Sequence, residues 1–142
     1  YNHYEVSNFA KPGFESAHNL IYWRNEQYAG FGPGAVSYIG EQRVTNTGYI
    51  DQYLKAPLEN RDTEDLCVDD QKLETLIQRF RTREGLRQSD YDDRFDANLI
   101  DDFGDALESL LERGLLELGD DRYAPTMAGY ELNNEIGLAL IP

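Results

Sequence analysis

The spacing of apolar residues changes at Asp70, and this change most strongly limits the folds open to the chain. Before Asp70, apolar residues come in short runs separated by glycines. After it they recur every three or four residues, which is the period of a helix that packs by one face. The first residues of this pattern are Leu73, Leu76, Ile77 and Phe80. The sequence therefore predicts strands in the N-terminal part and helices in the C-terminal part.

The C-terminal pattern predicts a winged-helix-like order of elements. After the first helix, Ser89 is expected to cap a short helix, and a second apolar stripe stops at Gly114, a residue type that ends helices. Residues 115–124 contain the Gly-Asp-Asp-Arg turn of a tight hairpin, and Thr126 is expected to cap a last helix. Residues 70–142 are thus expected to form a small winged-helix-like helical domain.

The N-terminal pattern predicts sheet edges or hairpins. Its short strand-like segments are residues 4–7, 28–31, 35–39 and 42–45. The following stretch combines a proline with many acids and few apolar residues, which is typical of a linker. We therefore expect a first unit over residues 1–57, a linker over 58–69 and a second unit from residue 70. The fold class expected from these patterns is α+β.

The charge of the chain argues against nucleic acid as a partner. There are 13 Lys plus Arg against 27 Asp plus Glu, a formal net charge of −14. Such a surface repels phosphate backbones and anionic membranes. The helix that a DNA-binding winged helix would place in the groove, residues 101–113, has five acids against Arg113 alone. The acid excess also fits a salt-adapted source, in which case it carries no information on partners.

Cysteine and apolar content exclude further classes. Cys67 is the only cysteine, which excludes an internal disulfide, a cysteine-based zinc site and an iron–sulfur cluster held by several thiolates of this chain. Low cysteine usage favours a cytoplasmic location. No apolar run is long enough to cross a bilayer, so we expect no integral membrane segment.

Two loop motifs have ordinary structural explanations. The segment Gly30–Ala35 lacks the spacing of a phosphate loop, and its three glycines fit either close backbone packing or the lining of a ligand cleft. The acids at 90–96 resemble a calcium loop, but Arg94 and Phe95 stand where a ligand and the turn glycine are needed. We therefore expect no calcium site.

The segment His18–Trp23 carries the most informative side chains. It holds one of the two histidines and the only tryptophan. If the segment is helical, His18 and Tyr22 share a face, and an imidazole beside a flat ring suits an iron porphyrin. Residues of these types at helical spacing are more often part of a core. From chemistry alone, both interpretations stay open.

The chain resembles the family of oxygen-independent coproporphyrinogen III oxidase-like proteins, in particular its heme chaperone branch. The N-terminal matches are the run Tyr4–Gly13, Glu15-Ser16, His18-Asn19, Tyr22-Trp23, Gly30, Gly32, Gly34-Ala35, Ser37-Tyr38, Arg43 and Asn46. The C-terminal matches are Gly85-Leu86-Arg87, Phe95, Gly114-Leu115-Leu116, Pro125-Thr126, Gly129 and Asn133. The resemblance covers essentially the whole chain and is most specific in the first fifty residues.

The resemblance implies a place in a larger protein. Family members begin with a radical S-adenosylmethionine (SAM) domain whose cysteines hold a [4Fe-4S] cluster, and one cysteine cannot supply that motif. The chain is thus expected to be the C-terminal part of such a protein: residues 1–57 the last strands of a truncated radical SAM β/α barrel, and residues 70–142 the small domain that closes these proteins. Alone, it is not expected to catalyse a reaction.

The resemblance also implies a heme site. The HNxxYW motif of the chaperone branch maps onto His18, Asn19, Tyr22 and Trp23, with His18 as ligand of the heme iron. The implied partners are heme or porphyrin and heme-acceptor proteins, and the exposed barrel edge favours a dimer. A true coproporphyrinogen III oxidase and an acidic, non-catalytic interaction module remain as alternatives.

Overall fold

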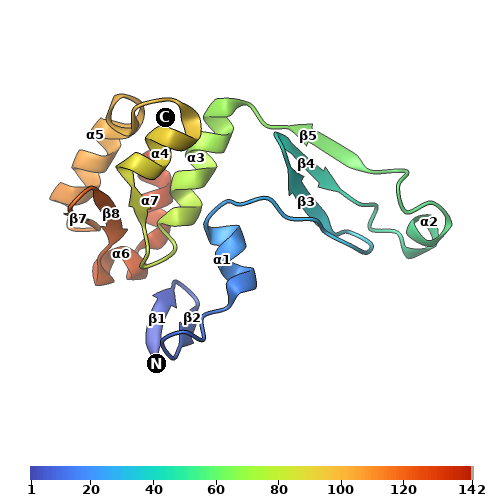
Figure 1. Cartoon of the computed structure of the whole chain (residues 1–142), viewed down its shortest axis with the longest axis horizontal. Coiled ribbons are helices and arrows are strands. Elements are labelled where there is room, and N and C mark those ends of the chain that lie inside the picture. The colour runs from blue at the N-terminus through green and yellow to red at the C-terminus, as the bar shows by residue number, and fades with distance from the viewer. Residues whose placement is uncertain (142) are drawn as a thin grey trace. The chain divides into compact units, whose positions relative to one another are not determined.

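A computed structural model describes residues 1–141. The chain forms two compact units, residues 1–25 with 72–142 and residues 26–71. Helices and small antiparallel sheets are mixed in the described part, which confirms the α+β class (Figure 1). No helix within residues 1–141 has the length and apolar character needed to cross a membrane.

The C-terminal part of the first unit has the winged-helix order of elements. The elements are α3 (Val68–Arg79), β6 (Leu86–Arg87), α4 (Gln88–Phe95), α5 (Leu99–Glu112), β7 (Leu116–Gly119), β8 (Arg122–Pro125), α6 (Met127–Glu131) and α7 (Asn133–Leu140). Strand β8 lies between β6 and β7, and both pairings are antiparallel. The predicted sequence of helix, short helix, helix, hairpin and helix is confirmed, with β6 as an additional short strand.

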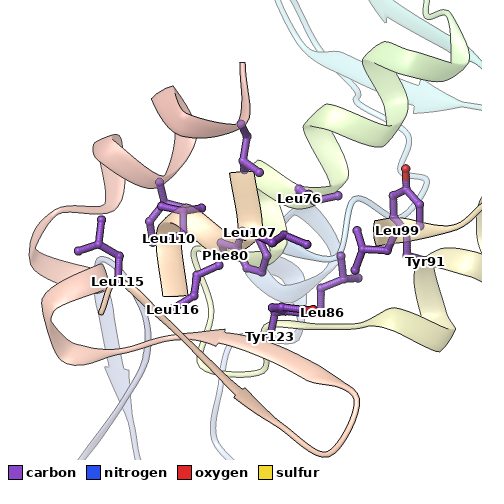
Figure 2. Packing of buried hydrophobic residues seen from close by; sticks show 12 residues of the cluster. Leu76, Phe80, Leu86, Tyr91, Leu99, Leu107, Leu110, Leu115, Leu116 and Tyr123 are labelled. Atoms are coloured by element: carbon purple, nitrogen blue, oxygen red, sulfur yellow. The ribbon is translucent and has the colours of Figure 1, made fainter. Parts of the chain in front are cut away.

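The apolar stripes of these helices form one core (Figure 2). The side chains of Leu76, Phe80, Tyr91, Leu99 and Leu110 have no exposed surface. Leu76 comes from α3, Phe80 directly follows that helix, and the others come from α4 and α5. The wing strands add further buried side chains. The helical period that begins at Asp70 therefore marks the face of α3 that packs on α4 and α5.

Helix ends in this part follow local side-chain chemistry. The Asn98 side chain caps α5 by accepting from the amides of Ile100 and Asp101, and Gly114 ends that helix with a φ of +67°. The Thr126 hydroxyl caps α6, as predicted. The last predicted helix is divided at Leu132 into α6 and α7.

The prediction that Ser89 caps α4 is wrong. Helix α4 begins at Gln88, and its N-cap is Arg87, which makes no side-chain cap hydrogen bond. The Ser89 hydroxyl instead donates to Asp121 in the turn of the wing, at 2.7 Å. Because strand β6 leads directly into α4, the helix starts two residues earlier than a cap at Ser89 would place it.

A hairpin opens the first unit. Strands β1 (Asn2–Glu5) and β2 (Asn8–Ala10) are antiparallel. The fully buried Glu5 carboxylate accepts hydrogen bonds from the Ser7 amide and the Asn8 side chain. Backbone hydrogen bonds from Val6 to Arg81 and from Arg83 to Tyr4 join the hairpin to the segment after α3.

The second unit is a three-stranded sheet with one short helix. Strands β3 (Val36–Ile39), β4 (Gln42–Thr45) and β5 (Asp62–Asp65) are antiparallel in that order, and α2 spans Ile50–Lys55. Strands β3 and β4 lie where the short apolar segments predict them. Strand β5 lies inside residues 58–69, for which the composition predicts a linker.

Candidate functional site

The HNxxYW segment forms helix α1 (Ala17–Trp23), as its spacing predicts. The Ser16 hydroxyl accepts from the amide of Asn19 at 3.3 Å and caps the helix start. The helix ends at Arg24, and Asn25 follows with a φ of +51°, a conformation that Asn adopts more readily than most residues. Serine before the motif and Asn after it thus delimit a helix of seven residues.

His18 and Tyr22 lie on one face of α1. Their ring centroids are 4.9 Å apart with the ring planes at 89°, an edge-to-face contact. The His18 side chain is exposed and Tyr22 is half-buried. The helix therefore presents an imidazole next to an aromatic ring.

Trp23 faces another way. The Arg81 guanidinium lies over its indole ring, with 5.0 Å between the guanidinium carbon and the ring centroid. The indole N–H is buried and has no hydrogen-bond partner among residues 1–141. The structure thus brings His18 and Tyr22 together and places Trp23 against the segment that follows α3.

The end of α1 is joined to the winged-helix domain by hydrogen bonds. The Arg94 guanidinium donates to the backbone carbonyls of Arg24 at 3.2 Å and Asn25 at 2.7 Å. The Asn25 side chain, itself buried, donates to the Thr75 hydroxyl at 3.1 Å. Arg24 pairs with Glu84 at 3.0 Å. These partners are far from α1 in the chain, so local spacing could not identify them.

Three guanidinium groups gather near this end of α1 despite the acidity of the chain. Burial lowers the pKa of Arg79, and the neighbouring charges of Arg24 and Arg94 lower it further. Glu84 and Asp90 oppose this effect, and Asp90 accepts from Arg79 at 3.2 Å. The two carboxylates therefore offset part of the positive charge, and the cluster joins α1 to α3 and α4.

The three glycine amides of the glycine loop all donate hydrogen bonds to other groups of the protein. The amide of Gly30 donates to the Ser37 hydroxyl, that of Gly32 to the Tyr53 hydroxyl and that of Gly34 to the Thr47 carbonyl. A Cβ at Gly30 would lie 2.1 Å from the Val36 carbonyl oxygen. Of the two interpretations left open by the sequence, close backbone packing explains Gly30, and these amides are not available to a phosphate.

The other candidate metal ligands, His3 and Cys67, have contacts that do not indicate a metal site. The His3 ring stacks on Phe9 at 4.2 Å and makes a hydrogen bond with the Val6 carbonyl. The Cys67 thiol is exposed and donates to Asp70 at 3.0 Å. Within residues 1–141 no group of three or more His, Cys, Asp or Glu side chains is placed to hold a metal ion. A heme iron needs only one protein ligand, and the exposed His18 imidazole beside Tyr22 is a side chain of the type that can serve as one.

Comparison with known proteins gives consistent results. The model of the HemN C-terminal domain family matches residues 67–132. The chain is 37% identical over 138 residues to the heme chaperone HemW of Lactococcus lactis subsp. lactis (strain IL1403), and 38% identical over 137 residues to the heme chaperone HemW of Bacillus subtilis (strain 168). These alignments cover 96% and 94% of this chain and 36% of each relative. The chain thus spans about a third of the length of these curated relatives.

The fold also matches a solved structure. The coproporphyrinogen III oxidase (HemN) from Escherichia coli, described as a radical SAM enzyme, aligns with a TM-score of 0.67 over 93% of this chain and 35% of that chain. The sequence identity is 22%, so this match shows a shared fold.

Residues 67–132 belong to the HemN C-terminal domain family. Over nearly its whole length the chain is similar to part of two relatives that are both named heme chaperone HemW, at 37% and 38% identity.

Proposed function

We propose that the chain belongs to a heme chaperone of the radical SAM class and that it takes up heme, as cargo, through helix α1. The observation that carries the proposal is the exposed His18 imidazole in edge contact with Tyr22 on a capped helix. A neutral imidazole is a common axial ligand of heme iron, and flat rings pack well on a porphyrin. The relatives named heme chaperones favour this function over a true oxidase.

Each motif residue has a defined part in this proposal. His18 supplies the nitrogen that holds the iron, and the Tyr22 ring against it limits the orientations of the imidazole. The backbone amide of Asn19 donates a hydrogen bond to the Ser16 hydroxyl and so fixes the first turn. Trp23, at the other end of the helix, packs under the Arg81 guanidinium. Heme itself supplies the iron, and the transfer to an acceptor protein would follow from exchange of the His18 ligand.

The chain's own residues set limits on the chemistry. The [4Fe-4S] cluster and SAM of the radical SAM class need several cysteines in one motif, and Cys67 alone cannot supply them. We therefore assign heme uptake, and no catalytic step, to these residues. A cytoplasmic location, heme-acceptor proteins as partners and a dimer of chains are further parts of the proposal.

The test is a hemin titration of the chain, followed by the Soret band. We expect a saturable shift near one heme per chain that is lost in His18→Ala. The matched control is His3→Asn, which removes the other histidine of the chain and leaves α1 intact. Equal binding by the parent chain and His18→Ala, or loss of binding in His3→Asn alone, would reject His18 as the ligand.

A further inference from the structure

The three ring-bearing motif residues, His18, Tyr22 and Trp23, divide between two faces of α1. With 3.6 residues per turn, His18 and Tyr22 are separated by about 40° around the helix axis, and His18 and Trp23 by about 140°. The ring contact between His18 and Tyr22 and the guanidinium over Trp23 agree with this division. One face therefore presents the proposed iron ligand, and the other is covered by protein.

The group that covers Trp23 is itself held in place. The Arg81 guanidinium donates to the Asn133 side-chain oxygen at 3.3 Å, and the Asn133 amide donates to the Phe80 carbonyl at 2.8 Å. The Nε atom of Arg81 is buried and has no hydrogen-bond partner among the described residues. The Trp23 contact is thus part of a chain of contacts that reaches the first residue of α7.

Helix α1 needs such contacts in order to persist. An isolated helix of seven residues is unstable in water, because nucleation is costly and few hydrogen bonds repay it. None of its residues is fully buried. The carbonyls of Arg24 and Asn25, directly after its last residue, accept hydrogen bonds from the Arg94 guanidinium of α4, at the end of the helix where a positive charge is favourable.

We propose that Arg81 and Arg94 are positioning residues of the heme site: through Trp23 and the backbone carbonyls that directly follow α1 they hold the helix on the winged-helix domain, so that Trp23 serves heme binding without touching the porphyrin. The part of this proposal that concerns heme rests on the function proposed above. The part that concerns the helix does not.

The helix part is tested without heme. Trp23 is the only tryptophan of the chain, so the tryptophan emission comes from this side chain alone and responds to the loss of its cover by Arg81. We expect Arg81→Gln to shift the emission to the red and to raise quenching by acrylamide, and Arg81→Lys to restore much of the parent signal. Arg113→Gln is the control, since its pair with Glu135 lies elsewhere. Unchanged emission in Arg81→Gln would overturn the proposal.

The heme part is tested by the rate at which bound hemin is lost to excess apomyoglobin. We expect Arg94→Gln and Trp23→Phe to lose hemin about tenfold faster while keeping the Soret position of the parent chain, a loss of the size that one cation–π or charged contact provides. His18→Ala changes the Soret position itself. A changed Soret position in Trp23→Phe would mean that Trp23 contacts the porphyrin and would overturn the proposal.

The two failures are distinguishable. If the parent chain retains no hemin, the proposed function fails, and the fluorescence of Arg81→Gln still decides whether the winged-helix domain holds α1. If the parent chain retains hemin but Arg94→Gln and Trp23→Phe both lose it at the parent rate, only the positioning role fails.

Discussion

Removal of the hydroxyl group is expected to have opposite effects on stability at two buried tyrosines. The Tyr91 side chain has no exposed surface, and its hydroxyl donates to the Asp102 carboxylate at 2.6 Å. The buried Tyr130 hydroxyl has no hydrogen-bond partner among residues 1–141. We therefore expect Tyr91→Phe to destabilise the winged-helix domain and Tyr130→Phe to leave it unchanged or more stable.

The magnitude follows from the charge of the acceptor. A hydrogen bond to a charged group contributes about 1.5–3 kcal/mol. The same Asp102 oxygen also accepts from Lys72 at 2.6 Å, so the carboxylate keeps one partner in Tyr91→Phe. We therefore expect a loss of about 1.5 kcal/mol, at the lower end of that range. For Tyr130→Phe the expected change in unfolding free energy lies between zero and a gain of about 1 kcal/mol.

The pH dependence provides a second check. Hydrogen bonds from Lys72 and Tyr91 hold the pKa of Asp102 below its usual range. A carboxylate of this kind adds stability above the pKa it has in the unfolded chain, near 4, and this stability is lost as the pH falls through the lower value in the folded chain. The difference between the parent chain and Tyr91→Phe should be complete at pH 7 and shrink below about pH 4.

Urea unfolding followed by circular dichroism measures both variants. For a loss of about 1.5 kcal/mol the midpoint of Tyr91→Phe should fall by about 0.5–1.5 M. A midpoint equal to that of the parent chain would refute the role of the Asp102 hydrogen bond. A loss in Tyr130→Phe as large as in Tyr91→Phe would show that the Tyr130 hydroxyl has a partner after all.

Three further predictions concern packing and titration. Gly30→Ala should lower thermal stability by about 1–3 kcal/mol, because its Cβ would lie 2.1 Å from a backbone oxygen that cannot move freely, and a calorimetric melt checks this. Leu107→Ala should cost about 2–5 kcal/mol in urea unfolding, since this side chain is 1% exposed in the core. Burial raises the pKa of Tyr130 above its usual range, so stability should fall above about pH 10, where the unfolded phenol ionises, and Tyr130→Phe should weaken that fall in alkaline melts.

The sequence predicted most of the winged-helix domain because most of its elements carry a local signal. The apolar stripes of α3 and α5, Gly114 after α5 and Thr126 before α6 all have the expected places. The prediction of a cap at Ser89 was wrong because a serine in the first turn bonds equally well to a neighbouring loop, here to Asp121. The division at Leu132 has no clear local signal, since the apolar period continues across it.

Strand β5 could not be predicted from its residues. All four of its side chains are exposed, so neither face has the apolar alternation that marks a strand. It is held by backbone pairing with β4 and by cross-strand pairs such as Arg43 with Glu64 at 2.9 Å. An acidic strand at the edge of a sheet has the composition of a linker, and only the partner strand distinguishes the two.

The candidate site was predictable only where its residues are close together in the sequence. The face shared by His18 and Tyr22 follows from helical spacing, and the structure confirms the helix and the ring contact. Arg81 and Arg94 were missed, because they reach α1 across 58 or more residues of sequence and nothing in their own neighbourhood marks them.

The most direct test of the central claim is chemical rescue of the proposed iron ligand. His18→Gly is loaded with hemin, with and without imidazole in the buffer, and the heme that co-elutes with the chain in gel filtration is measured by its Soret band. We predict that His18→Gly retains little heme alone and regains a one-to-one complex with the parent spectrum when imidazole replaces the missing ligand. Retention of heme by His18→Gly without imidazole, with an unchanged spectrum, would contradict the account.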